Sequence, residues 1–285
     1  MSRSQSVQGA DSRTMLLRRV YCTALCISLT VMLVSGLSLV AIGRLKGRVG
    51  VGGGGFDTET QKIRIYIDQG HNPTPHHNNG AEGNGLFEQD ITYDIGCRLA
   101  ELLRADGRFE VCLSRPTAET VLGEDVSSSL KARVDGAAAF CADFFISLHV
   151  NAYTEDTANG IEVLVSEGDD VSYTFGDFLL EGMVEATALR NRGIKWSADL
   201  YVLRYTDMPA VLLEMGFISH TGDAELLADH PEWLAEGIYD GIVAYFSSVY
   251  TADLSGLLWI CSVSAAVTMT LVIIATCRRK AKNKP

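Results

Sequence analysis

The sequence predicts an α/β domain, in which a mostly parallel six-stranded sheet is covered by helices on both faces and flanked by two transmembrane helices. Between residues 63 and 250, short runs rich in apolar and β-branched residues alternate with longer segments of helical period. A stretch of 22 residues without charge precedes this region, and a second uncharged stretch of similar length follows it. The alternation predicts the fold, and the uncharged stretches predict the spans.

The predicted strands follow from their apolar content. The segment 143–150 contains Phe-Phe-Ile-Ser-Leu, a run expected of a strand that is covered on both faces. In chain order we predict strands at Ile63–Asp68, Phe109–Ser114, Asp143–Val150, Gly160–Val165, Leu200–Arg204 and Pro209–Leu213. Residues 57–250 are numerous enough for one such domain.

The predicted helices lie between these strands. The first, Glu88–Leu103, and the last, which begins at Pro231, each place four large apolar side chains on one face. Proline is favoured in the first turn of a helix, which fixes the start of the last one. Two further helices are predicted near Ser128–Phe140 and Val171–Leu189. The face of the first helix carries Ile91, Ile95, Leu99 and Leu102, and that of the last carries Leu234, Ile238, Ile242 and Tyr245.

The flanking segments predict a protein of the cell membrane. Tyr21–Ile42 would be about 33 Å long as a helix, which matches the hydrocarbon core of a bilayer, and Leu254–Cys277 is the second predicted span. Basic tails, 1–20 and 278–285, lie outside the spans, and a glycine-rich linker, 43–62, follows the first. By the positive-inside rule, both termini are expected to be cytoplasmic and the domain between the spans, 63–250, is expected to be extracytoplasmic.

Two features bear on this topology. Arg44, Lys46 and Arg48 follow the first span and favour the opposite orientation, but the five basic residues after the second span are the stronger signal. The alternative for the first span is a cleaved signal peptide. Its length exceeds the usual apolar core of a signal peptide and no clear small-x-small site follows, so an uncleaved anchor is the preferred interpretation.

Charge is strongly segregated along the chain. Residues 57–250 carry 33 Asp and Glu against 12 Lys and Arg, whereas the flanks carry 2 acidic and 12 basic residues. An acidic domain lacks the basic surface that nonspecific binding to nucleic acid requires, so no nucleic-acid partner is expected. Membrane lipid, contacted through the two spans, is the expected partner of the basic flanks.

Three titratable side chains follow or end predicted strands. His71 comes shortly after the first strand, His149 closes the strand 143–150, and Glu214 closes Pro209–Leu213. In open α/β sheets, ligands bind at the carboxyl ends of the strands, so these side chains should meet at one edge. Glu88, at the start of its helix, can reach the same edge after a glycine-rich loop. Two imidazoles and a carboxylate are the usual protein ligands of a catalytic zinc ion.

The remaining choices concern alternatives within the same segments. His76 and His77 compete with His71 as ligands, but nothing strand-like positions them, so His71 is preferred. Glu88 could instead be an acidic residue that the helix dipole favours. A carboxylate that ends an apolar run, as Glu214 does, is costly to bury unless it is paired or functional, and it would suit a catalytic acid–base residue.

These stretches resemble the zinc-dependent N-acetylmuramoyl-L-alanine amidases of the type-3 class, a family of cell-wall hydrolases. The resemblance runs from about Ile63 to Phe246. Asp68-Gln69-Gly70-His71 is similar to the family's Asp-Pro-Gly-His, and the glycine-rich segment 80–88 is similar to the one that ends in its ligand glutamate. Residues 146–152 are similar to Ser-Ile-His-x-Asn-Ala, and 209–217 to Pro-Ala-x-Leu-x-Glu-x-Gly-Phe.

The chain also departs from the family's pattern. Gln69 stands in place of the proline, Asn72-Pro73 in place of Gly-Gly, and Ala138 where an asparagine often follows the helix arginine. Supporting matches to the family are Ser114-Arg115, Leu130 with Arg133, and Arg192 to Lys195. The departures lie beside the expected ligands rather than on them, so they bear on ligand surroundings and substrate fit.

The resemblance implies a zinc enzyme that hydrolyses the amide between N-acetylmuramic acid and L-alanine in peptidoglycan. It implies that His71, Glu88 and His149 bind Zn²⁺ and that Glu214 is the catalytic residue. Two alternatives stay open: a noncatalytic peptidoglycan-binding or scaffold protein that keeps the fold, and a zinc peptidase that cleaves the stem peptide elsewhere.

Overall fold

The computed structural model describes residues 62–282, apart from some side chains between 250 and 282. The chain divides into two compact units. One consists of residues 57–248, and the other of residues 1–56 together with 249–285. The first unit contains the sheet and the candidate site.

The main sheet has six strands in the order β4-β1-β5-β8-β6-β7. Strands β4, β1, β5 and β8 are mutually parallel, β6 runs antiparallel to β8, and β7 is parallel to β6. The predicted mostly parallel six-stranded sheet is therefore confirmed. The strands are β1 (Ile63–Gln69), β4 (Phe109–Leu113), β5 (Phe144–Asn151), β6 (Ile161–Ser166), β7 (Asn191–Ser197) and β8 (Ala210–Phe217).

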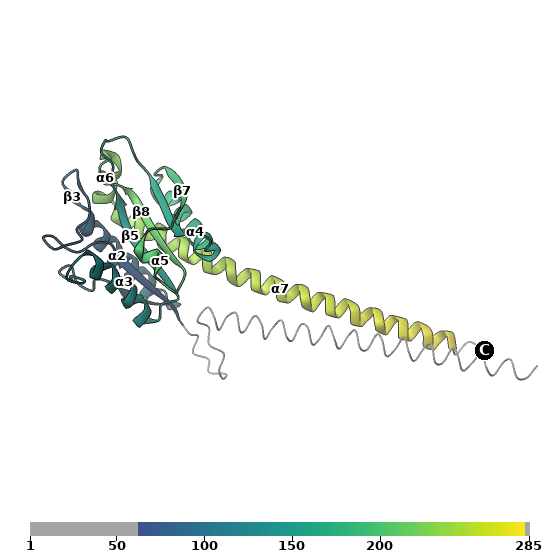
Figure 1. Cartoon of the computed structure of the whole chain (residues 1–285). Helices are drawn as coiled ribbons and strands as arrows, with labels where there is room; N and C mark the ends of the chain where they lie inside the picture. The colour runs from purple at the N-terminus through teal and green to yellow at the C-terminus, as the bar shows by residue number, and fades with distance from the viewer. Residues whose placement is uncertain (1–61, 283–285) are drawn as a thin grey trace, which may run out of the picture. The chain divides into compact units, whose positions relative to one another are not determined.

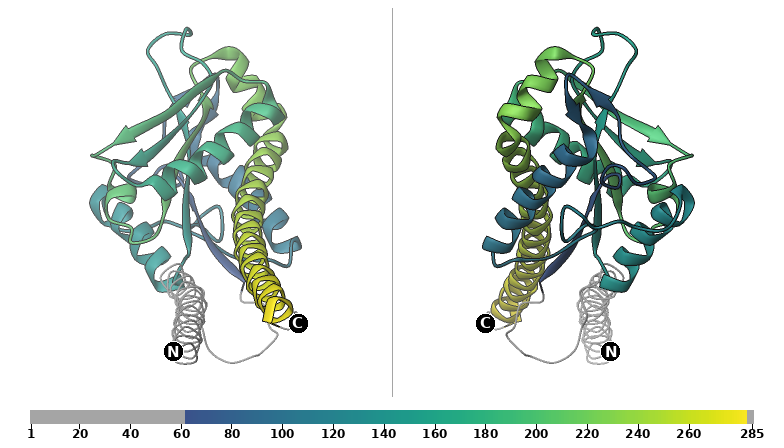
Figure 2. Two further views of the ribbon diagram at one scale, coloured as in Figure 1. Left: turned by 90° about the vertical axis from the view of Figure 1, so that its right-hand side faces the viewer. Right: turned by 90° about the vertical axis from the view of Figure 1, so that its left-hand side faces the viewer.

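Helices cover both faces of the sheet (Figures 1 and 2). Buried side chains of α2, α4 and the first part of α7 pack on one face, and those of α3 and α5 pack on the other. A small hairpin, β2 (Glu82–Gly83) and β3 (Leu86–Phe87), precedes α2. The helices are α2 (Glu88–Ala105), α3 (Val126–Phe140), α4 (Asp170–Thr187), α5 (Tyr201–Arg204), α6 (Thr221–Asp229) and α7 (Pro231–Lys282).

Helix α7 returns the chain to the edge of the sheet where the parallel strands begin. The ring of Phe246 lies 5.8 Å from that of Phe109 and 5.3 Å from that of Phe144, the first residues of β4 and β5. Leu234, Ile238 and Ile242 are fully buried, as the predicted apolar face requires. The carboxyl ends of β1, β5 and β8 are thus left free for other contacts.

One predicted strand is wrong. Leu200–Arg204 is not a strand, because its last four residues form the short helix α5, which buries Val202 and Leu203. A short apolar run has no periodicity that separates a strand from a helical turn. The sixth strand is instead β7, whose polar sequence, Asn-Arg-Gly-Ile-Lys-Trp-Ser, is tolerated because it lies at the edge of the sheet.

The structure describes only part of the two predicted membrane spans. The first, Tyr21–Ile42, lies outside the described residues, and so do more than half of the side chains of the second, Leu254–Cys277, which falls within α7. In the part of the chain that the structure describes, no helix is both long and apolar enough to cross a membrane.

Candidate metal centre

The candidate site lies at the carboxyl ends of three parallel strands. His71 follows β1 by two residues, His149 lies in β5, and Glu214 lies in β8. His149 and Glu214 are register partners on neighbouring strands, so both side chains project from the same face of the sheet. The sequence therefore brings residues from distant positions to one edge through strand register alone.

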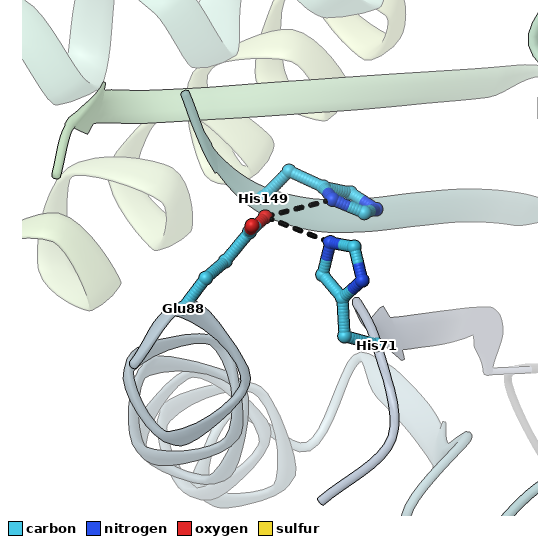
Figure 3. Close-up of side chains that lie close together, drawn as sticks. All are labelled: His71, Glu88 and His149. Atoms are coloured by element: carbon cyan, nitrogen blue, oxygen red, sulfur yellow. Dashed lines mark hydrogen bonds and ion pairs between the residues drawn. The ribbon is translucent and has the colours of Figure 1, made fainter. Parts of the chain in front are cut away.

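His71, Glu88 and His149 converge on one point (Figure 3). Their ligand atoms all lie within 4.8 Å of one another. The Oε1 atom of Glu88 lies 3.1 Å from Nε2 of His71 and 3.0 Å from Nδ1 of His149. Among the described residues, this is the group of three or more His, Cys, Asp or Glu side chains that could hold a metal ion.

Backbone donors fix the carboxylate of Glu88. The amide of Ala81 donates to Oε2 at 2.8 Å, and the amide of Val150 donates to Oε1 at 2.9 Å. Burial raises the pKa of Glu88, but the hydrogen bonds from His149 and His71 outweigh burial and hold the pKa well below its usual range. Glu88 is therefore a carboxylate, the form that binds a cation.

The ring of His71 fits a cation particularly well. Its Nδ1 lies 3.2 Å from the carbonyl oxygen of Asn78, while Nε2 faces the Glu88 carboxylate. Both ring nitrogens thus face acceptors, so the ring is satisfied only if it carries two protons or if a cation replaces one of them. A backbone carbonyl on the second nitrogen is also the usual partner of a metal-binding histidine.

Arg133 of α3 holds the backbone that presents His71. Its Nη1 donates to the carbonyl of Gln69 at 2.7 Å, and its Nη2 donates to the carbonyl of His71 at 2.6 Å. His71 has a φ of 69°, a left-handed conformation that few side chains adopt without such support. The arginine side chain is almost fully buried. It therefore acts as a clamp on the loop after β1.

Asp68 balances the buried charge of Arg133. Its Oδ1 accepts from Arg133 at 2.5 Å, and its Oδ2 accepts from the hydroxyl of Ser147 at 2.8 Å. Burial raises the pKa of Asp68, but the Arg133 guanidinium, His149 and these hydrogen bonds lower it below its ordinary value. Both charges are thus paired and hydrogen-bonded, as buried charges must be.

Two glycines leave room for the ligands. A Cβ atom on Gly70 would lie 2.5 Å from the carbonyl oxygen of Leu148 and 2.7 Å from Cε1 of His149. On Gly80, a Cβ atom would lie 2.7 Å from Oε2 of Glu88. All three distances are shorter than nonbonded atoms allow, so these positions exclude a side chain.

Glu214 differs from the other carboxylates of the site. Its Oε2 is buried and has no hydrogen-bond partner among the described residues. Burial first, and the negative charges of Glu88 and Glu162 next, raise the pKa of Glu214 to about 8. A cation beside it would lower that pKa, because a positive charge favours the ionised form. The group is therefore suited to exchanging protons near neutral pH.

The edge continues beyond Glu214 into β6 and β7. Glu162 is the register partner of Glu214 and accepts from Arg192 at 2.8 Å and from the side-chain amide of Asn151 at 3.1 Å. The Arg192 guanidinium lies 4.8 Å from the centre of the Phe217 ring. These residues form a polar cluster next to the candidate metal centre.

The other histidines of the domain lie apart from this ligand group. His71 joins the ligand group, whereas Nε2 of His77 lies 3.2 Å from the carbonyl of Leu122, and His76 is not in the group. His220 and His230 cap the two ends of α6. The sequence does not indicate the contacts that Asp68, Ser147 and Arg133 make in the site, because these contacts join positions 62 to 79 residues apart.

Comparison with known proteins gives the family. The sequence profile of the family described as N-acetylmuramoyl-L-alanine amidase matches residues 65–244. The chain is 35% identical over 186 residues to the N-acetylmuramoyl-L-alanine amidase LytC of Bacillus subtilis, a match that covers 64% of this chain and 35% of LytC. It thus spans about a third of that relative's length.

Two further relatives are similar over more of their own length. The N-acetylmuramoyl-L-alanine amidase CwlM of Bacillus licheniformis is 33% identical, over 65% of this chain and 69% of CwlM. The catalytic domain of the amidase CwlV from Bacillus (Paenibacillus) polymyxa var. colistinus superposes with a TM-score of 0.58. That structure is 30% identical and covers 65% of this chain and 98% of the CwlV domain.

Proposed function

Because the chain belongs to the N-acetylmuramoyl-L-alanine amidase family, we propose that it hydrolyses the amide between N-acetylmuramic acid and L-alanine in peptidoglycan. The observation that carries the proposal is the convergence of His71, Glu88 and His149 beside the unpartnered carboxylate of Glu214. A noncatalytic relative would be expected to have lost at least one of these residues, and all four are present here.

We propose that His71, Glu88 and His149 hold a zinc ion. Two imidazole nitrogens and one carboxylate are the donors of catalytic zinc sites, which keep a further position open. The acceptors on both nitrogens of His71 and the ionised state of Glu88 support a cation at this point. When bound, zinc supplies a Lewis acid that polarises a carbonyl and makes a water molecule more acidic.

Glu214 is the proposed catalytic base and acid. Its carboxylate accepts a proton from the attacking water and returns it to the amine of the leaving L-alanine. The raised pKa of the buried group favours the first step, because the anion of a weaker acid takes up a proton more readily. Arg133 and Asp68 do not contact the reacting atoms, and they position His71.

Digestion of purified peptidoglycan tests the proposal. We expect the purified full-length protein to contain about one equivalent of zinc and to release peptides that begin with a free L-alanine amino group, while the glycan strands stay intact. Mass spectrometry of both products measures this. Cleavage between later residues of the stem peptide would identify a peptidase instead, and binding of peptidoglycan without any cleavage would identify a noncatalytic protein.

We also propose that the chain is anchored in the cell membrane by Tyr21–Ile42 and Leu254–Cys277, with the catalytic domain outside and both termini inside. The support is the absence of charge in both stretches and the basic residues beyond them. A domain held at both ends would act on peptidoglycan close to the membrane surface.

Protease protection in spheroplasts tests this topology. We expect externally added protease to degrade the domain 63–250 and to spare a tag placed at either terminus. The intact domain free in the growth medium, or a protected domain with accessible tags, would contradict the anchored arrangement.

A further inference from the structure

A row of polar side chains crosses the sheet from the metal centre to its far edge. His149 in β5, Glu214 in β8 and Glu162 in β6 are successive register partners, so their side chains project from one face. Arg192 in the edge strand β7 donates to Glu162 and ends the row. The row therefore begins at a metal ligand and ends at a cation.

Arg192 is held in place on three sides. Its Nε donates to Oε2 of Glu162 at 2.8 Å, its Nη1 donates to the carbonyl of Asn159 at 3.3 Å, and its guanidinium lies over the ring of Phe217. Its Nη2 donates to no protein atom among the described residues. The side chain is 27% exposed. A preorganised guanidinium with a free, accessible donor is the usual arrangement for binding a carboxylate.

The distance from the reaction site suits the second residue of a peptide. Adjacent strands are about 4.8 Å apart, so the backbone of Arg192 lies roughly 14 Å from that of His149, and the long arginine side chain points back to Glu162. An extended peptide covers about 3.5 Å per residue. A chain that leaves the scissile amide across Glu214 therefore brings its second residue near this guanidinium.

We propose that Arg192 forms a subsite for the free carboxylate of the residue that follows L-alanine in the stem peptide. This inference rests on the proposed amidase function. Glu162 and Phe217 are positioning residues in it, because they orient the guanidinium. The subsite makes the enzyme prefer peptides in which that carboxylate is free over those in which it is converted to a carboxamide.

A simpler role for Arg192 is to hold β7 to β6 through its pair with Glu162. Loss of such a pair would lower stability and leave substrate preference unchanged. Preference between two substrates that differ at a single group thus separates the two roles.

The test uses the full-length, zinc-loaded protein and two synthetic N-acetylmuramoyl peptides that differ only in this group, carboxylate or carboxamide. We expect kcat/KM to favour the carboxylate by roughly 10- to 100-fold, the effect of a hydrogen bond to a charged group. In Arg192→Gln the ratio should fall to about 1, chiefly through loss of rate on the carboxylate substrate.

Two further variants keep the test interpretable. Arg190 is exposed and lies two residues before Arg192. Arg190→Gln removes a positive charge there and should keep the preference of the native protein. The double variant Arg192→Gln with Glu162→Gln leaves no carboxylate without its cation, so it should fold even where the single variant is unstable, and it should also lose the preference.

Binding of the released dipeptides, measured by calorimetry, gives a second readout that does not depend on turnover. Equal rates and equal affinities for both ligands in the native protein, or an unchanged preference in both Arg192 variants, would overturn the subsite. Absence of cleavage with a retained, Arg192-dependent preference in binding would instead reject the proposed hydrolysis and keep the subsite.

Discussion

The two sides of the candidate site treat their carboxylates in opposite ways. On the β1, α2 and β5 side, both oxygens of Glu88 and both oxygens of Asp68 have hydrogen-bond partners, and both groups have lowered pKa values. On the β8 side, Glu214 has a buried oxygen without a partner and a raised pKa. Satisfied groups hold a fixed geometry, whereas an unsatisfied group is available to react.

The largest effect on activity is expected from a substitution of Glu214, the carboxylate without a hydrogen-bond partner. Glu214→Gln keeps the size of the side chain but removes its ability to carry protons, so kcat should fall by about 10²- to 10⁴-fold. Zinc content, measured by mass spectrometry of the metal, should stay at the native level. His149→Ala is the matched contrast and should lose both zinc and activity. A fully active Glu214→Gln variant would remove the proposed role.

Arg133→Met tests the supporting side. It leaves Asp68 buried without its cation, so the free energy of unfolding should fall by about 3–5 kcal/mol. Because His71 loses the donor to its carbonyl, zinc affinity should also fall, by about 10- to 100-fold. Chemical denaturation and competition with a chelator measure these two quantities.

Two controls accompany this variant. Lys131→Met removes an exposed ion pair from the same helix and should change stability by less than about 1 kcal/mol. Adding Asp68→Asn to Arg133→Met should restore part of the stability but not the zinc affinity. Full recovery of zinc affinity in the double variant would mean that the clamp on His71 is not needed.

Gly70→Ala tests the close contact between the loop after β1 and the strand β5, which carries His149. The new methyl group would overlap the carbonyl of Leu148 and the ring of His149, so we expect a loss of about 1–3 kcal/mol and weaker zinc binding. Thermal unfolding with and without zinc measures both. Gly107→Ala, whose Cβ would meet no atom within 4 Å, is the control and should leave zinc binding unchanged.

The smallest effect concerns acid stability. The pKa of Asp68 in the folded protein lies below the ordinary value of 3.8, so its stabilising contribution is complete above that value and is lost as pH falls through the folded pKa. The free energy of unfolding should therefore decline less steeply below about pH 4 in Asp68→Asn than in the native protein. Asp135→Asn, at an exposed position, should keep the native slope.

Elements with a clear apolar pattern could be predicted from the sequence, whereas features that depend on tertiary contacts could not. The strands that deliver His149 and Glu214 are apolar runs, and their ends are correctly predicted to lie at one edge. In the structure His71, and not His77, lies together with Glu88 and His149. Leu200–Arg204 is wrong because four apolar and basic residues suit a helical turn as well as a strand.

Arg133 and Arg192 lie in segments that resemble the family, but their contacts could not be predicted from the sequence. Arg133 contacts the carbonyls of Gln69 and His71, and backbone acceptors leave no mark on residue type. Arg192 reaches Glu162 only because β6 runs against β8 and β7 follows β6. An alternation of strands and helices favours a parallel sheet and gives no indication of this reversal.

Glu88 begins a helix that packs on one face of the sheet, while His149 projects from the face that α3 covers. An ion bound by these side chains would link the helices on one face of the sheet to the helices on the other. The free energy of zinc binding would then stabilise the whole domain against unfolding, so that the melting temperature rises with the free zinc concentration.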